Sequence, residues 1–283
     1  VDRAAKPVQL CLCSNQLIRH REFQKEFCVN GFNCYTAEAF SASRNRRKKM
    51  KKFLDRNSLF NRVNERGFKP SHVAEVGVYK PQTSNIYDFI KAGVRTTLVE
   101  PDPKSIARIK EHFAGQKNIK LHEVAIFDRE GEIELIQREA STFVSELKDS
   151  PAICNDSYQA RNEDKFVVRC VTFDKIDDGS IDLLSVDVEG SEWYILKTLQ
   201  SRPAVISLET HGAAYLNPNL DDINTWMKNN GYKVWYKNSS DTVFVKPSII
   251  EITAADKTAL KLANLYLKFN RFRKRLKNRL TGR

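Results

Sequence analysis

The chain has 283 residues, of which 41% are hydrophobic and 29% are charged, and its formal net charge is +12. The hydrophobic fraction is enough for a packed core and excludes a globally disordered chain, and the length suits one large domain with extensions. No segment reaches the roughly 20 consecutive apolar residues of a membrane-spanning helix, and residues 1–30 lack the apolar stretch of a signal peptide, so we expect neither.

The positive charge is concentrated at the two ends of the chain. Residues 1–72 hold 16 Lys and Arg against 6 Asp and Glu, residues 250–283 hold 10 against 2, and residues 73–249 hold 21 against 27. A uniformly basic chain would indicate nucleic-acid binding, but here the middle is mildly acidic. We therefore predict a basic extension over 1–71, a central domain over 72–249 and a basic helix over 250–283.

Six cysteines are present: Cys11, Cys13, Cys28, Cys34, Cys154 and Cys170. Four of them lie in the first 34 residues, and their spacing does not match the paired C-x2-C pattern of common zinc sites. We interpret them as thiols of a cytoplasmic protein, with a metal or disulfide site as the alternative. Cys170 stands in an apolar segment and is expected to be buried.

Regular elements follow one another from residue 43 onward. Residues 43–67 predict a basic helix or helix pair, closed by Gly67 and Pro70. Residues 139–165 are polar and irregular and predict an inserted or mobile loop. We predict strands over 72–79, 96–102, 119–127, 128–136, 166–176, 181–190, 204–212, 232–237 and 242–247. We predict helices over 84–93, 103–115, 191–200, 220–231 and 254–280.

This order of elements predicts an α/β fold. Strands that alternate with helices indicate a mostly parallel sheet with right-handed crossovers. The last two strands, 232–237 and 242–247, are joined by a short turn and must be antiparallel neighbours. A parallel sheet with an antiparallel terminal pair is the Rossmann-like arrangement of class I methyltransferases. In such sheets, ligands bind beyond the carboxyl ends of the strands.

Acidic residues stand at the carboxyl ends of five of the predicted strands. They are Glu75, Glu100, Asp128, Asp187 with Glu189, and Glu209, and His211 follows the last of them. One acid after a strand is usually a helix cap, but five in register predict a ligand site at this edge. Glu100 stands where a carboxylate can accept both hydroxyls of an adenosine ribose, and Gly77 lets the backbone approach a ligand closely.

These landmarks resemble the FkbM family of S-adenosylmethionine-dependent methyltransferases. The matching segments are VAEVGVY, LVEPDP, EVAIFDREGEIEL, VTFDKI, IDLLSVDVEGSEWYILKTL and SLETHG, and they span residues 72–247. The DVEG block, with Thr172 and Asp174 ahead of it, is the most specific part. The resemblance implies S-adenosylmethionine as cofactor and a glycan or similar hydroxylated molecule as acceptor. The residues expected to hold the cofactor are Glu75, Gly77, Thr83, Ser84, Glu100, Ala125 and Asp187.

The first motif departs from the family pattern. Glu75 replaces the usual Asp, Tyr79 replaces a common Asn, and Pro81 stands where a second Gly is common. The loop 78–84 is therefore not a glycine-rich cradle. We expect it to hold the methionine part of the cofactor through the hydroxyls of Thr83 and Ser84 or through backbone amides.

Methyl transfer to a hydroxyl requires an aligned acceptor and a base that accepts its proton. His211 is the first candidate because a histidine is neutral near pH 7, Asp187 is the second and Glu189 the third. Glu209 could hold His211. Structural roles stay open, with His211 bonded beside a turn and Glu189 capping a helix. Asp187 and Glu209 could bind a divalent ion, but their spacing is not diagnostic and we predict no metal.

The C-terminal segment predicts a basic amphipathic helix. Its apolar positions recur at steps of three and four, namely Leu262, Leu265, Phe269, Phe272, Leu276 and Leu280. Basic residues surround them, namely Lys268, Arg271, Arg273, Lys274, Arg275, Lys277 and Arg279. Such a helix is typical of an anionic membrane surface, with packing on its own domain or on a partner as the alternative. The basic run 44–52 could add to this surface or bind RNA.

The sequence as a whole predicts a cytoplasmic O-methyltransferase that acts on a glycan or similar acceptor, with placement at a membrane surface through its basic ends as an alternative to a free enzyme. One alternative is methylation of another metabolite or of RNA. The other is an inactive module that keeps the fold and docks to anionic surfaces. Nucleic acid is the less favoured partner because the central part is acidic.

Overall fold

The computed structural model describes residues 48, 50, 51, 54, 55, 58–138, 141–146, 162–212 and 215–281. The four N-terminal cysteines and Cys154 lie outside these residues, as does most of the basic run 44–52. Within the predicted basic helix region, the structure shows α3 (Leu59–Glu65), which begins at the cap Ser58. The Ser58 side chain accepts a hydrogen bond from the backbone N–H of Asn61, as a helix N-terminus requires.

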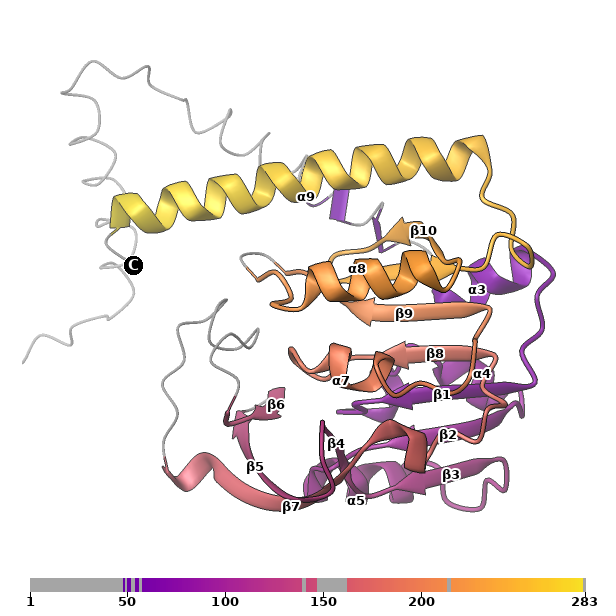
Figure 1. The fold of residues 1–283 in the computed structure, drawn as a ribbon, viewed down its shortest axis with the longest axis vertical. Helices are drawn as coiled ribbons and strands as arrows, with labels where there is room; N and C mark the ends of the chain where they lie inside the picture. Colours follow the sequence, from indigo (N-terminus) through magenta and orange to yellow (C-terminus); the bar gives the residue numbers. More distant parts are fainter. Residues whose placement is uncertain are drawn as a thin grey trace, which may run out of the picture. The chain divides into compact units, whose positions relative to one another are not determined.

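A seven-stranded sheet forms the framework, in the order β10-β11-β9-β8-β1-β2-β3 (Figure 1). Its strands are β1 (His72–Val76), β2 (Arg95–Val99), β3 (Ile119–His122), β8 (Leu183–Val186), β9 (Val205–Glu209), β10 (Lys233–Lys237) and β11 (Asp241–Val245). All neighbours are parallel except that β11 runs antiparallel to both β9 and β10. The predicted α/β fold with an antiparallel terminal pair is confirmed.

Helices cover both faces of this sheet. The helices are α4 (Tyr87–Lys91), α5 (Pro103–His112), α7 (Glu192–Leu196), α8 (Leu220–Asn229) and α9 (Ala254–Thr281), with short 3-10 turns η1 (Pro81–Thr83), η2 (Asn162–Asp164) and η3 (Phe173–Lys175). One apolar layer joins α3, α4 and α5 to the sheet, and the other joins α7 and α8. The central strands are buried on both faces, which is why they are continuous apolar runs in the sequence.

A second sheet, in the order β4-β7-β5-β6, is the main departure from the predicted elements. Its strands are β4 (Ala125–Ile126), β5 (Gly131–Arg138), β6 (Ser141–Val144) and β7 (Lys165–Val171). The strand predicted over 119–127 is in fact two, since β3 pairs with β2 and β4 pairs with β7. Part of the predicted loop is also a strand, because β6 pairs with β5 and buries Phe143.

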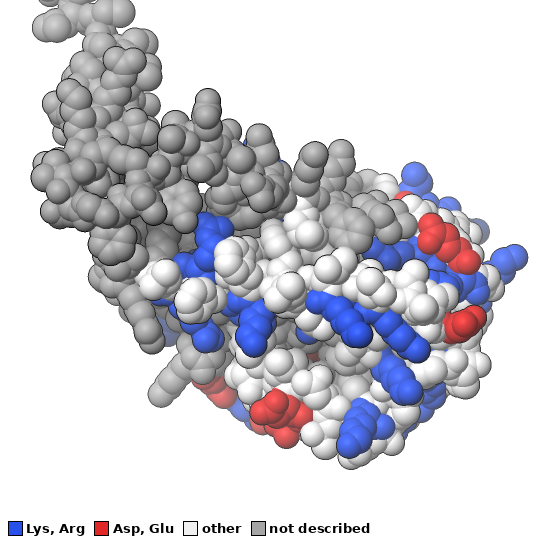
Figure 2. Space-filling model, turned by 90° about the horizontal axis from the view of Figure 1, so that it is seen from above, with Lys and Arg blue, Asp and Glu red and all other residues white. Residues whose placement is uncertain are grey.

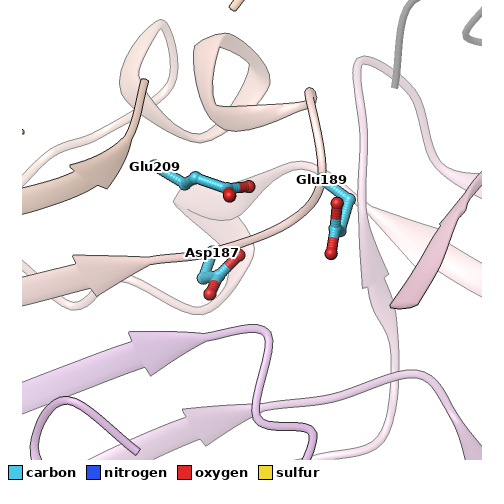
Figure 3. A group of neighbouring side chains, drawn as sticks. All are labelled: Asp187, Glu189 and Glu209. Carbon is cyan, nitrogen blue, oxygen red and sulfur yellow. The ribbon is translucent and has the colours of Figure 1, made fainter. Parts of the chain in front are cut away.

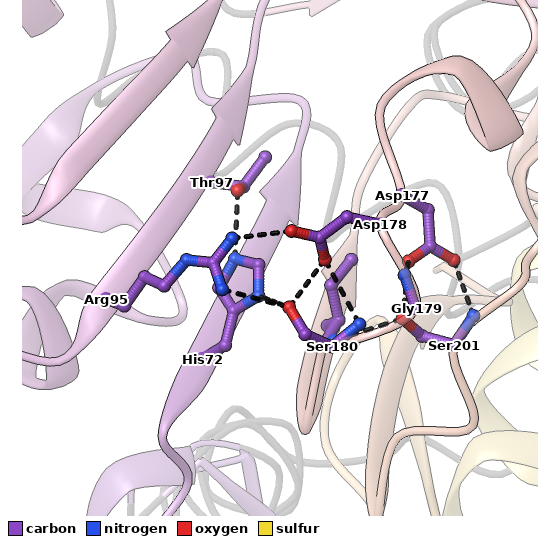
Figure 4. Close-up of polar contacts among 9 residues, drawn as sticks. His72, Arg95, Thr97, Asp177, Asp178, Gly179, Ser180 and Ser201 are labelled. Atoms are coloured by element: carbon purple, nitrogen blue, oxygen red, sulfur yellow. Dashed lines mark hydrogen bonds and ion pairs between the residues drawn. The ribbon is translucent and has the colours of Figure 1, made fainter.

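A polar network links the loops at the amino ends of the central strands (Figure 4). The two ring nitrogens of His72 lie 2.9 Å from Ser180 Oγ and 2.9 Å from Thr97 Oγ1, and burial lowers the pKa of His72. Asp177 is buried and accepts hydrogen bonds from the backbone N–H groups of Gly179, Gln200 and Ser201 and from the Ser201 hydroxyl. These contacts fix one end of the sheet and leave the carboxyl edge for ligands.

Replacing Asp177 with Ala leaves these buried donors without their acceptor, so we expect a loss of about 3 kcal/mol in the free energy of unfolding. Urea denaturation measures this loss. Asp178→Ala is the matched control, because the Asp178 side chain is 50% exposed where it pairs with Arg95 at 2.6 Å. An exposed pair of this kind contributes less than about 1 kcal/mol. Equal losses in the two variants would contradict the assignment.

Candidate active site

A cavity of about 210 Å³ lies at the carboxyl edge of the central sheet. The ends of β1, β2 and β8, the start of β11, the loop after β1 and the second sheet all contribute to its walls. The structure brings all the predicted cofactor residues together here, and each of them lines the cavity: Glu75, Gly77, Thr83, Ser84, Glu100, Ala125 and Asp187. Glu189 lines it as well.

Glu100 is held rigidly at the end of β2. One of its carboxyl oxygens accepts a hydrogen bond from the backbone N–H of Val78 at 2.7 Å, and the other accepts one from Asp102 at 2.8 Å. Burial raises the pKa of Glu100 to about 7. Each oxygen accepts one of these bonds and has a second lone pair, and Glu100 lines the cavity, so the carboxyl group can still accept from two further hydroxyls.

Glu75 anchors the loop that follows β1. Its carboxyl group accepts hydrogen bonds from the Ser84 hydroxyl and, at 3.0 Å, from the Asn85 backbone N–H. Burial raises the pKa of Glu75 to about 7. The Thr83 hydroxyl donates to the carbonyl of Lys80 at 3.0 Å. Both loop hydroxyls therefore donate within the protein, which leaves ligand binding at this loop to acceptor lone pairs and backbone groups.

The fold itself requires a glycine at position 77, independently of any ligand. Its φ is +87°, and a Cβ placed there would lie 1.9 Å from the carbonyl oxygen of Asp187. No other residue avoids this clash, because only glycine has no Cβ. The end of β1 thus lies directly against the turn that carries Asp187.

The turn after β8 is supported by Glu192, a residue that the sequence analysis did not assign to the site. Glu192 is fully buried and accepts hydrogen bonds from the backbone N–H groups of Val188 and Gly190 and from the amide of Asn217. Ser191 occupies the predicted cap position, but its hydroxyl donates to the Val188 carbonyl instead. The sequence did carry a signal for this role: Glu192 is the last residue of the DVEGSE block and stands at the start of a predicted helix.

Three carboxyl groups converge beside the cavity (Figure 3). One oxygen from each of Asp187, Glu189 and Glu209 lies within 4.8 Å of the others, and Glu189 has a left-handed backbone with φ of +54°. Burial and the neighbouring acids raise the pKa values of both Asp187 and Glu209. Like charges this close cannot all be ionised, so the group retains a proton above the usual carboxyl range.

The cluster formed by Asp187, Glu189 and Glu209 can take part in several kinds of chemistry. Within the described residues, Glu209 Oε2 is buried and has no hydrogen-bond partner. Asp241, at the start of β11, is a further buried acid in the cavity wall that the sequence analysis missed. A set of oxygens like this can hold a shared proton, accept hydrogen bonds from several hydroxyls, or provide oxygen ligands to a divalent cation.

The structure does not place His211 with these acids. His211 is 1% exposed and is not among the residues that line the cavity. Its Nδ1 lies 2.9 Å from Thr210 Oγ1, its Nε2 lies 3.2 Å from the Asn238 carbonyl, and burial lowers its pKa to about 4. Both ring nitrogens are thus engaged within the protein, and Nε2 joins the end of β9 to the β10–β11 turn. The expected role of His211 as base is not supported by this geometry.

The comparison with protein families bears on this site directly. Residues 73–234 match the family model described as the methyltransferase FkbM domain. The chain belongs to this family. Its activity is therefore methyl transfer and its cofactor is S-adenosylmethionine, as the sequence motifs implied. A comparison with curated proteins found no match.

Several solved structures are similar to this FkbM-domain chain at low sequence identity. A ribosomal protein L11 methylase from Lactobacillus delbrueckii subsp. bulgaricus is 12% identical, with a TM-score of 0.35 over 65% of this chain and 74% of the other. A candidate caffeoyl-CoA O-methyltransferase from Staphylococcus aureus is 13% identical, with a TM-score of 0.37 over 82% and 96%. Scores this low support nothing by themselves, and the fold assignment rests on the strand order.

The residues of the cavity fit the cofactor. Glu100 has spare acceptor lone pairs for the ribose hydroxyls, and Asp187 and Asp241 can accept from the amino group. The second sheet contributes Ala125, Ile126, Leu135 and Phe143 to the cavity wall, and these side chains provide apolar surface for the purine ring. Glu75 holds the loop that would face the methionine part.

Glu100→Ala removes both carboxyl acceptors from the end of β2. Because hydrogen bonds to a charged group each contribute about 1.5–3 kcal/mol, we expect the dissociation constant for S-adenosylmethionine to rise by about 100-fold or more. Isothermal titration calorimetry measures it. Glu111→Ala, at an exposed position of α5, is the control. Unchanged cofactor affinity in a folded Glu100→Ala variant would refute this role.

Proposed function

We propose that this enzyme methylates a hydroxyl group of a glycan or a similarly polyhydroxylated acceptor. The observation that supports this acceptor class is the convergence of Asp187, Glu189 and Glu209, of which the first two line the cavity. Carboxylate oxygens accept hydrogen bonds, so a cluster of them that retains a proton still suits a molecule that presents several neighbouring O–H donors.

The charge of the cavity favours an uncharged acceptor. Five of its lining residues are acidic, namely Glu75, Glu100, Asp187, Glu189 and Asp241, whereas Lys80 is the one basic residue among those that line it in the described structure. A phosphorylated acceptor or an RNA backbone would bring further negative charge to these acids, which is unfavourable at short range. A neutral sugar or polyol avoids this repulsion.

Asp187 is the residue that we assign as the base. When bound, the cofactor supplies a methyl group on a positively charged sulfur, which takes up the electron pair of the breaking C–S bond. Asp187 accepts a hydrogen bond from the acceptor O–H and takes its proton as the oxygen forms the new bond to carbon. Burial and the nearby charges of Asp241 and Glu189 keep the pKa of Asp187 raised, which makes it a stronger base than an ordinary carboxylate.

A methylation assay with isotope-labelled cofactor tests the acceptor class. The full chain is incubated with extracted glycolipids, free sugars, phosphorylated sugars and RNA, and products are identified by mass spectrometry. We expect a gain of one methyl group on uncharged hydroxylated acceptors, and no gain with Asp187→Asn. Methylated RNA, or methyl transfer confined to phosphorylated acceptors, would contradict the proposal.

The pH dependence of turnover tests the base. Asp187 must be deprotonated to act, so kcat/KM rises with pH through its raised pKa. Glu189→Gln removes a neighbouring negative charge, which lowers the pKa of Asp187 and moves this rising limb to lower pH. Asp187→Asn should reduce kcat by about 100-fold or more. A rising limb that stays in place in Glu189→Gln would show that a different group titrates.

A further inference from the structure

The two faces of helix α9 have different surroundings. The helix has 28 residues and is about 42 Å long. Ala263 and Leu267 are buried on the side that contacts β10. The other side presents five large apolar side chains that are 47–68% exposed, namely Leu262, Leu265, Phe269, Phe272 and Leu276. Their spacing of three and four residues places them in one line, which we call the apolar seam.

This apolar seam is the largest such feature on the described surface. The described residues include eight exposed large hydrophobic side chains, and five of them belong to the seam. Single exposed apolar residues need no explanation, but a contiguous line of them indicates a binding surface. The seam therefore requires an occupant.

Basic side chains border the apolar seam on both sides. Lys261, Lys268 and Arg275 lie along one border and Arg273 lies along the other, as the helical spacing dictates. No acidic residue follows Asp256 in the helix, and Asp256 itself is paired with Arg66 at 2.7 Å. Figure 2 shows Lys and Arg side chains interspersed with uncharged ones along this face.

Charge decides between the possible occupants. In a helix pair formed along the seam by two copies of this chain, the bordering positions would face one another and bring Lys and Arg together with no acid to neutralise them. Residues 1–72 are also strongly basic, so they offer no complementary charge. Anionic lipids supply both missing elements, which are negative charge at the headgroups and an apolar layer beneath them.

We propose that α9 docks the enzyme on an anionic membrane surface, with the apolar seam among the lipid chains and the basic borders at the headgroups. Among the helices of the described part, none is long and apolar enough to span a bilayer. The helix would therefore lie in the plane of the interface, as basic amphipathic helices do.

This docking places the active-site edge near the lipid. Helix α9 contacts β10, and burial together with the charge of Arg271 in the second half of α9 lowers the pKa of Lys237, the last residue of β10. The second half of α9 thus stands at the carboxyl edge of the sheet and extends past the end of β10 (Figure 1). If the proposed acceptor class is correct, a lipid-linked glycan would be presented at this edge. That last step rests on the proposed function, whereas the docking does not.

Cosedimentation of the full chain with vesicles tests the docking without cofactor or acceptor. We expect binding to phosphatidylcholine vesicles that contain phosphatidylglycerol, little binding to phosphatidylcholine alone, and weaker binding at high salt. F269Q/F272Q should reduce partitioning by about tenfold or more. Its matched control is V167Q/I249Q, which removes exposed apolar side chains away from α9 and should bind like the original chain. Each of K268A and R275A should weaken binding by about fivefold.

Three outcomes would overturn the proposal. The first is equal sedimentation of F269Q/F272Q and the original chain with the anionic vesicles. The second is a dimer in analytical ultracentrifugation that F269Q/F272Q converts to a monomer, since this would assign the seam to a second copy. The third is tighter binding of an RNA oligonucleotide than of anionic vesicles, lost in K268A and R275A. Because no methyl transfer is measured, these outcomes are independent of the acceptor.

Discussion

The close contact between Gly77 and the Asp187 carbonyl is the constraint on which the site depends. It joins the ends of β1 and β8, the two neighbouring strands between which the chain reverses its direction of travel across the sheet. Because no Cβ fits there, the loop after β1 and the turn after β8 are fixed relative to each other. The carboxyl group of Glu75 accepts a hydrogen bond from a backbone amide of the loop after β1, and that of Glu192 accepts hydrogen bonds from two backbone amides of the turn after β8. The positions of the loop and of Asp187 follow from this arrangement.

The acids of the site fall into two groups with different consequences. Glu75, Glu100 and Glu192 are satisfied by backbone N–H donors, so they serve to hold the chain or to orient a ligand. Asp187 and Glu209 face other acids instead, and Glu209 Oε2 has no hydrogen-bond partner among the described residues. A buried carboxyl oxygen without a partner and the repulsion among neighbouring acids are both unfavourable for the fold. Residues of this second group are therefore better explained by chemistry than by stability.

The fold and the cofactor residues could be predicted because they follow from local patterns. Alternating apolar strands and helices define the sheet, and parallel strands bring their carboxyl ends to one edge, which located Glu100 and Asp187. Asp241 escaped this reasoning because it begins the antiparallel strand β11, whose amino end lies at that same edge. Strand β6 is too short for a readable alternation. His211 lies two residues past the end of β9, and the direction in which its side chain points depends on the backbone conformation there. The sequence does not define that conformation.

The crowding of carboxyl groups in the cavity also affects the binding and release of ligands. A cationic ligand reduces the repulsion among these acids, so its binding releases protons and adds to the stability of the folded enzyme. The methyl donor carries a positive charge on sulfur, and its demethylated product does not. The same acids therefore give the enzyme a higher affinity for the methyl donor than for its demethylated product. We expect this difference to favour product release and renewed loading with donor after each methyl transfer.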